Sequence, residues 1–200
     1  MTSSRDASHF ARIYQSNPDP WGFRTDPYEQ AKYRHSISML QHRRFTAGLE
    51  VGCSIGILTH MLAPHCDTLL GLDIIEQPLE AARLRCADQP WVRFERMQVP
   101  ATWPDQRFDL ILLSEVLYFL SPADIDHCAT RVTGSLLPTA TVLLVNWLGQ
   151  SDDPSSGDEA AERFIAATAG SLRIAHQDRH SRYRLDQLVT PFGNYDLLDP

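Results

Sequence analysis

Two acids and two glycines in the first half of the chain have types and a spacing that suit the binding of a cofactor. Glu50 and Gly52 follow an apolar run that begins at residue 45, and Gly56 precedes a helical stretch. Asp73 ends the next apolar run. Glycines let a ligand approach the backbone, and a carboxylate at the end of a strand can accept hydrogen bonds from sugar hydroxyls. This order of features is typical of a nucleotide-type cofactor site at the carboxyl edge of a parallel sheet.

The elements that position these residues alternate regularly along the chain. The apolar runs predict strands at 46–51, 68–73, 92–96, 108–114 and 140–146. Helical patterns between them predict helices at 56–63, 77–88 and 122–136. Alternation of strand and helix at this spacing favours βαβ units, and therefore a doubly wound, Rossmann-like α/β fold with a mostly parallel sheet.

The C-terminal part departs from the alternation. Ser156 and Glu159 predict a capping box that starts another helix. Two strand-like segments follow at 172–178 and 183–189, and only three residues separate them. Because so short a connection cannot make a parallel crossover, these strands must be antiparallel. The expected sheet therefore has seven strands, with an antiparallel pair at its C-terminal end.

The part before the first strand is predicted to be helical. Asp26 can cap a helix, Pro27 suits its first turn and Glu29 can complete a capping box. We expect this helix to run to about residue 43. The 200 residues thus divide into an N-terminal helical segment at 1–44 and a single-domain core at 45–200.

Composition limits the classes of function. A net charge of −7 disfavours binding to a nucleic-acid backbone, and no apolar run is long enough for a membrane span. The N-terminus lacks the apolar segment of a signal peptide, so we expect a cytoplasmic protein. The four cysteines and eight histidines have no metal-ligand spacing, so no metal is expected, and His127 and His180 are minor acid–base candidates. Lys32 is the only lysine, which argues against a catalytic lysine.

The glycine pattern distinguishes between cofactors. A dinucleotide site requires Gly-x-Gly-x-x-Gly, and this chain has Ser54 and Ile57 at the second and third glycine positions. A dehydrogenase is therefore disfavoured. The remaining pattern, Glu-x-Gly-x-x-x-Gly, resembles motif I of the class I S-adenosylmethionine-dependent methyltransferases, from which Ser54 departs at the middle glycine.

This resemblance implies the class I methyltransferase fold and S-adenosylmethionine as cofactor. It places Asp73 against the ribose hydroxyls, and Gln98 where members of the superfamily often have an acid that contacts the adenine amine. Met97 would cover the adenine, unless it is a plain core residue. The full set of expected cofactor-binding residues is Glu50, Gly52, Cys53, Ser54, Gly56, Asp73, Ile74, Met97, Gln98 and Ser114.

A closer resemblance rests on two further segments. Residues 17–23, Asn-Pro-Asp-Pro-Trp-Gly-Phe, precede motif I, and residues 114–120, Ser-Glu-Val-Leu-Tyr-Phe-Leu, close the fourth strand. Together they look like the NodS-type methyltransferases, which N-methylate the free amine of a deacetylated chitooligosaccharide. The similarity spans about residues 9–148. It implies a small-molecule acceptor, most simply the amine of an amino sugar.

The candidate catalytic residues lie just after the fourth strand. Glu115 is placed to receive or orient an amine, and Tyr118 lies one helical turn further on. At the end of the fifth strand, Asn146 can hydrogen-bond a sugar hydroxyl and Trp147 can stack on a sugar. Each of these residues also has a structural explanation, as a first-turn acid, a core tyrosine or a strand end.

The N-terminal segment is a candidate lid over the cofactor. Its aromatic residues Trp21, Tyr28 and Tyr33 are the expected acceptor contacts, although packing of an amphipathic helix explains Tyr33 equally well. Two other functions stay open on the sequence alone. One is a small-molecule O-methyltransferase, and the other is a cofactor-binding partner protein without catalysis.

Overall fold

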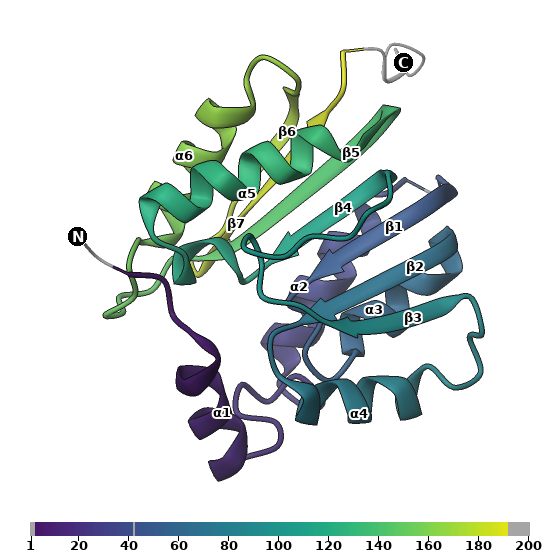
Figure 1. Cartoon of the computed structure of the whole chain (residues 1–200), viewed down its shortest axis with the longest axis vertical. Helices are drawn as coiled ribbons and strands as arrows, with labels where there is room; N and C mark the ends of the chain where they lie inside the picture. Colours follow the sequence, from purple (N-terminus) through teal and green to yellow (C-terminus); the bar gives the residue numbers. More distant parts are fainter. Residues whose placement is uncertain (1–2, 42, 192–200) are drawn as a thin grey trace.

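Seven strands form one sheet in the computed structural model, which describes residues 3–41 and 43–191 (Figure 1). The strands are β1 (Phe45–Val51), β2 (Cys66–Asp73), β3 (Val92–Arg96), β4 (Phe108–Ser114), β5 (Leu136–Trp147), β6 (Arg173–Arg179) and β7 (Tyr183–Val189). Their order across the sheet is β3-β2-β1-β4-β5-β7-β6. Strands β1 to β5 pair in parallel, whereas β7 is antiparallel to both β5 and β6. The predicted doubly wound sheet with its antiparallel C-terminal pair is confirmed.

Helices cover both faces of this sheet (Figure 1). They are α1 (Ala7–Ser16), α2 (Pro27–Ser38), α3 (Ile57–Leu62), α4 (Glu76–Arg85), α5 (Pro122–Gly134) and α6 (Gly157–Thr168). Successive residues of β4 face opposite sides, as strand geometry requires. Leu110 and Leu112 pack in the cluster beside α2 and α3, whereas Ile111 and Leu113 pack in the cluster beside α5 and α6. No helix among residues 3–41 and 43–191 is long and apolar enough to cross a membrane.

The predicted capping residues lie at the N-termini of α2 and α6, with one correction. The capping box of Ser156 and Glu159 is present in full. Asp26 caps α2 by accepting from the Tyr28 N–H at 2.8 Å, but Glu29 does not complete a box there, because its carboxylate binds Lys32 instead. Helix α2 ends at Ser38 and not near residue 43, because a turn follows it.

Helix α1 lies within the segment predicted to be helical, but no separate helix was predicted at its position. Asp6 caps it by accepting from the His9 N–H at 3.1 Å. In Figure 1 the helix lies beyond the ends of the strand arrows, on the side where the parallel strands finish. The residues before it are tied to the same edge, since the Arg5 side chain donates to the Asp153 carboxylate at 3.0 Å. The N-terminal segment therefore stands opposite the carboxyl edge of the sheet.

Candidate active site

A cavity of about 570 Å³ lies between the carboxyl edge of the sheet and the N-terminal segment. The ends of β1, β2 and β4 form one wall, and residues of α1, α2 and the loop between them form the other. Its volume is within the range of about 300–1,000 Å³ that small-molecule sites occupy. The cofactor residues predicted at the strand ends therefore face a space of suitable size.

The turn after β1 is built on two glycines that no other residue could replace without strain. Gly52 and Gly56 both have left-handed backbones, with φ of +77° and +74°. A Cβ at Gly52 would lie 2.5 Å from Val116 Cγ2, and one at Gly56 would lie 2.8 Å from Ala82 Cβ. Gly52 lines the cavity, whereas Gly56 does not line it and instead lets α3 pack closely on α4. The two motif glycines thus serve different purposes.

Ser54, at the middle position of the motif, behaves like a glycine in its backbone and adds a side-chain bond. Its φ is +48°, its N–H donates to Asp73 Oδ2 at 2.9 Å, and its hydroxyl shares a 2.5 Å hydrogen bond with the Tyr14 hydroxyl. Tyr14 belongs to α1 and is buried. The departure from the motif therefore links the cofactor turn to the N-terminal segment.

Asp73 presents a nearly enclosed carboxylate at the end of β2. Its two oxygens accept from the N–H groups of Ser54 and Ile75, each at 2.9 Å. Burial raises the pKa of Asp73 to about 6, although these hydrogen bonds act in the opposite direction. Because each carboxylate oxygen has a second lone pair, Asp73 can still accept from a pair of ligand hydroxyls.

Glu50 brings a buried and partly unsatisfied carboxylate to the cavity wall. It is only 2% exposed, and its Oε2 has no hydrogen-bond partner among the described residues. Burial raises the pKa of Glu50 to about 8, and the charge of Asp73 adds to the rise. An unpaired buried carboxylate is costly unless a cation or donor meets it. These residues line one cavity and suit S-adenosylmethionine, whose ammonium would meet Glu50, whose ribose hydroxyls would meet Asp73 and whose adenine would meet Ile74 and Met97.

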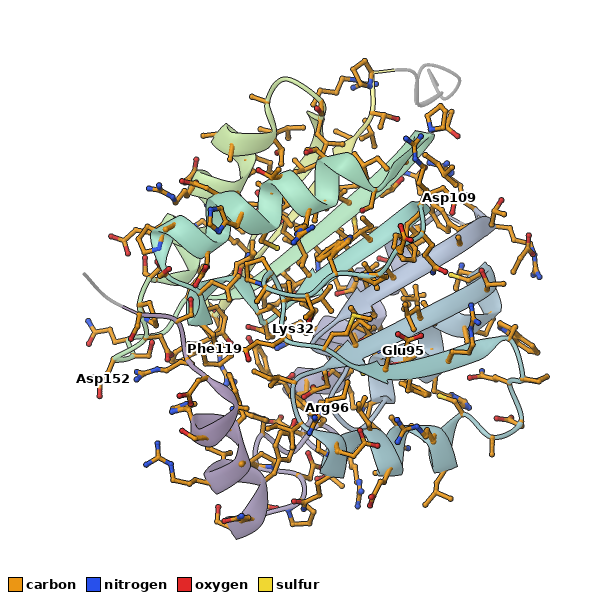
Figure 2. All side chains as sticks on the ribbon, in the orientation of Figure 1. Lys32, Glu95, Arg96, Asp109, Phe119 and Asp152 are labelled. Atoms are coloured by element: carbon orange, nitrogen blue, oxygen red, sulfur yellow. The ribbon has the colours of Figure 1, made fainter. Side chains whose placement is uncertain are left out.

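The other end of the cavity holds a buried ion cluster centred on Lys32. The Lys32 ammonium is 2.5 Å from Glu115 Oε1 and 2.9 Å from Glu29 Oε2, and Lys32 is 2% exposed. Burial opposes its charge, but Glu115 and Glu29 outweigh that effect and raise the pKa of Lys32. Burial also raises the pKa of Glu29. One cation between two carboxylates leaves this cluster with a net negative charge. Figure 2 shows Lys32 well inside the outline of the molecule, with Asp109 at the opposite edge of the sheet.

Glu115 is held by three donors from different parts of the chain. Besides Lys32, the Tyr118 hydroxyl and the Trp147 N–H donate to it, at 3.0 and 2.9 Å. Its backbone is left-handed, with φ of +58°. This arrangement fixes the Glu115 carboxylate in the cavity wall. Tyr118 contributes to it through its own hydrogen bond to that carboxylate.

Aromatic residues of the N-terminal segment complete the opposite wall. Trp21 stacks on Phe23, with ring centroids 5.5 Å apart, and contacts Tyr14 edge-on at 5.6 Å. The Tyr28 hydroxyl is buried without a partner among the described residues, and the Arg182 guanidinium lies 3.6 Å from the centre of its ring. Tyr33 also lines the cavity. The three predicted acceptor contacts of this segment are therefore brought together.

Most of the predicted site residues line the cavity, and three do not. Among those that do are Cys53, Ser114 and Trp147. Besides Gly56, the exceptions are Gln98, whose N–H binds Thr102 Oγ1 in a turn, and Asn146, which is fully buried.

Three cavity residues were missed as functional residues by the sequence analysis, namely Tyr14, Glu29 and Lys32. Lys32 did carry a signal, because a single lysine in a chain rich in arginine is placed three residues after a glutamate on a helix.

Comparisons with known proteins identify the family to which the sequence is similar. Residues 8–177 match the model of the family described as NodS, Nodulation protein S. The chain is 32% identical over 158 residues to Nodulation protein S of Bradyrhizobium diazoefficiens, which covers 78% of this chain and 72% of that protein.

Solved structures extend the likeness to the fold. The N-methyltransferase NodS of Bradyrhizobium japonicum, crystallised with S-adenosylhomocysteine, superposes with a TM-score of 0.78 at 22% identity, over 90% of this chain and 98% of that one. A putative methyltransferase from Pseudomonas syringae superposes with a TM-score of 0.68 at 29% identity, over 81% of this chain and 98% of that one. These matches confirm the predicted class I methyltransferase fold.

Proposed function

The chain belongs to the NodS family, and from this premise we propose that it transfers a methyl group from S-adenosylmethionine to the free amine of an amino sugar or a chitooligosaccharide-like acceptor. The family assignment and the fold support the cofactor and the methyl transfer. The amine as acceptor rests on the cavity itself.

The observation that carries the proposal is the charge at the two ends of one cavity. At one end, the buried Glu50 carboxylate lacks a partner, which suits the ammonium of the cofactor. At the other end, Glu29 and Glu115 outnumber Lys32, which suits an acceptor that arrives as a cation. A neutral hydroxyl acceptor could hydrogen-bond to these carboxylates but would gain no attraction between opposite charges. The cavity therefore favours N-methylation over O-methylation.

The bound cofactor supplies a methyl group that its sulfonium has already activated. The chain's own residues must align a neutral nucleophile with that methyl group and exclude water, and such orientation can lower a barrier by about 7–11 kcal/mol. Glu115, fixed by three donors, orients the amine. Glu29 accepts the proton that the ammonium must lose, since its pKa is already raised by burial.

We assign the N-terminal segment the role of a lid. Trp21, Tyr28 and Tyr33 lie in the wall opposite the strand ends, and the bond between Tyr14 and Ser54 ties that wall to the cofactor turn. Trp147, at the end of β5, offers a ring for stacking on a sugar. The described part of the segment 1–44 therefore closes over the described part of the core 45–200. Residues 1–2 and 42 of the segment and 192–200 of the core lie outside the described structure.

We also place the reaction in the cytoplasm, on a small molecule. The four cysteines are free and buried, as expected in a reducing compartment. The net charge of −7 supports a small-molecule acceptor over a nucleic acid.

Calorimetry and labelled methyl transfer test the proposal. We expect heat of binding with S-adenosylmethionine and none with NAD. Labelled methyl should pass to a glucosamine oligomer, and the fully N-acetylated oligomer is the matched control because it keeps every hydroxyl but lacks the amine. Equal transfer to both oligomers would establish O-methylation instead. An absence of heat with S-adenosylmethionine would overturn the cofactor assignment.

Two substitutions separate the proposed roles of the acids. Glu29→Gln should lower kcat most at low pH, where the acceptor is charged and needs a proton acceptor. Glu115→Gln should lower kcat by a similar factor at every pH, because it disturbs orientation. Identical pH profiles for the two variants would contradict this division.

A further inference from the structure

Two histidines and an aspartate from distant parts of the sequence meet outside the cavity. His35 lies on α2, Asp178 lies near the end of β6, and His180 follows that strand. One ligand atom from each lies within 4.8 Å of the others. Both imidazoles direct Nε2 at the same carboxylate oxygen, and each Nε2 is 3.4 Å from Asp178 Oδ2.

These distances match those expected around one tetrahedral metal ion. With metal–ligand bonds of about 2.0–2.1 Å, two ligand atoms of a tetrahedral zinc site are about 3.3–3.4 Å apart. Two imidazoles bound through Nε2 would have ring centroids roughly 5 Å apart. The centroids of His35 and His180 are 5.0 Å apart. Both nitrogen-to-oxygen distances and the spacing of the two rings thus have the values expected of a coordinated set.

Tyr183 contacts both histidines and orients them as metal ligands. The Tyr183 hydroxyl lies 2.8 Å from His35 Nδ1. In the tautomer whose Nδ1–H donates to this hydroxyl, Nε2 keeps the free lone pair that a metal requires. His180 stacks on the Tyr183 ring, with centroids 4.6 Å apart, which orients the second ligand.

We propose that His35, Asp178 and His180 form a binding site for zinc or a similar divalent transition metal. Two imidazoles and one carboxylate suit zinc, whereas magnesium and calcium prefer oxygen ligands alone. His35 and His180 also line an open hollow of about 400 Å³, which leaves room for water at the fourth position. The ligands come from opposite ends of the chain, so their spacing in the sequence gave no sign of the site.

Such a metal would brace the acceptor end of the cavity from outside. The site connects α2, which carries Glu29 and Lys32, to the hairpin formed by β6 and β7. A metal that binds only the folded protein stabilises it by mass action. Zinc should therefore raise the melting temperature of the whole protein, independently of any methyl transfer.

The test uses untagged protein stripped of metal and titrated with zinc against a chromogenic chelator near pH 7.5. The wild type should bind one zinc per chain and melt at a higher temperature. His180→Gln should weaken binding by at least about 100-fold, and Tyr183→Phe by roughly 10-fold through loss of the supporting hydrogen bond. His127→Gln is the matched control, because His127 also lies near an aspartate, 3.9 Å from Asp124, in an exposed pair without a second histidine.

The same protein can be examined by nitrogen NMR, where zinc should shift the imidazole signals of His35 and His180 and leave His127 unchanged. His180 is exposed, so its substitution leaves the fold in place, which melting in the presence of EDTA will verify. A wild type that binds no stoichiometric zinc would overturn the proposal. So would equal losses of affinity in His180→Gln and His127→Gln.

Discussion

The two ends of the cavity differ in whether their carboxylates have partners within the protein. At the cofactor end, the Glu50 carboxylate is buried with an oxygen that has no partner among the described residues. At the acceptor end, the carboxylate of Glu115 is bound by Lys32, Tyr118 and the Trp147 N–H. One end lacks a cation, whereas the other already contains one.

Because of this difference, the two ends should contribute differently to cofactor binding and to the stability of the fold. A buried carboxylate without a partner weakens the folded state and gains most when a cationic ligand arrives. A buried cluster in which a cation is paired with carboxylates holds the surrounding elements in place, and removing its cation leaves uncompensated charge. We therefore expect removal of the cation at the acceptor end to change mainly stability, and removal of the carboxylate charge at the cofactor end to change mainly affinity.

The largest effect should follow from Lys32→Met. It leaves Glu29 and Glu115 buried without their shared cation, which should lower the free energy of unfolding by about 3–5 kcal/mol. Denaturation with urea, followed by circular dichroism, measures the change. Arg44→Met is the control, because the Arg44 pair with Asp67 is exposed and its loss should cost no more than about 1 kcal/mol. Equal costs for the two variants would remove the distinction between the buried cluster and a surface pair.

Glu50→Gln should lower the affinity for the cofactor without lowering the stability of the fold. Its cofactor affinity should fall by roughly 10- to 100-fold, since a hydrogen bond to a charged group contributes about 1.5–3 kcal/mol. Its stability should not fall at pH 8. The pKa of Glu50 rises on folding, from 4.5 to about 8, so ionisation of Glu50 weakens the wild type as the pH increases through that window. Calorimetry and thermal melting on the same sample measure both quantities. A variant that is less stable at pH 8 but binds normally would reverse the assignment of the two ends.

The cofactor end was predictable because its parts are local in sequence. Glu50, Gly52 and Asp73 lie within two consecutive strands and the helix between them, where residue type and spacing determine the geometry. The acceptor end was not, because Lys32 and Glu115 are 83 residues apart and meet only in the folded chain. Glu115 was identified by its place after a strand, whereas its partners Glu29 and Lys32 were interpreted only as helix residues.

The missed helix α1 shows a different kind of error. Phe10, Ile13 and Tyr14 have helical spacing and Asp6 is a good cap, so a local signal existed. The prediction began at Asp26, where the proline and the acid make a stronger start. Gln98 and Asn146 failed to reach the cavity for another reason, since the position at a strand end does not determine which way a side chain points.

The pH dependence of cofactor affinity should show whether the unpaired Glu50 carboxylate binds the ligand. Glu50 must be ionised to bind an ammonium, and its pKa is about 8 in the free protein. Affinity should therefore rise with pH by up to about tenfold per unit from pH 6 towards 8. Above about pH 8 the amine of the ligand loses its own proton and affinity falls again. Calorimetric titrations across this range should show the rising limb in the wild type and lose it in Glu50→Gln. A rising limb that persists in the variant would assign the titration to another group.

The smallest effect concerns the bond that joins the two walls. Tyr14→Phe removes the hydroxyl that pairs with Ser54, and a neutral hydrogen bond of this kind contributes about 0.5–1.5 kcal/mol. Ser54→Gly removes the other partner and leaves the buried Tyr14 hydroxyl unpaired, although glycine suits the left-handed backbone at that position.

In the Ser54→Gly background, Tyr14→Phe should therefore be neutral or stabilising, because it deletes a hydroxyl that has already lost its partner. A double-mutant cycle measured by urea denaturation gives the coupling between the two side chains directly. Additive effects would mean that the bond contributes nothing. The N-terminal wall would then depend on its other contacts with the core, among them the ion pair of Lys32 with Glu115.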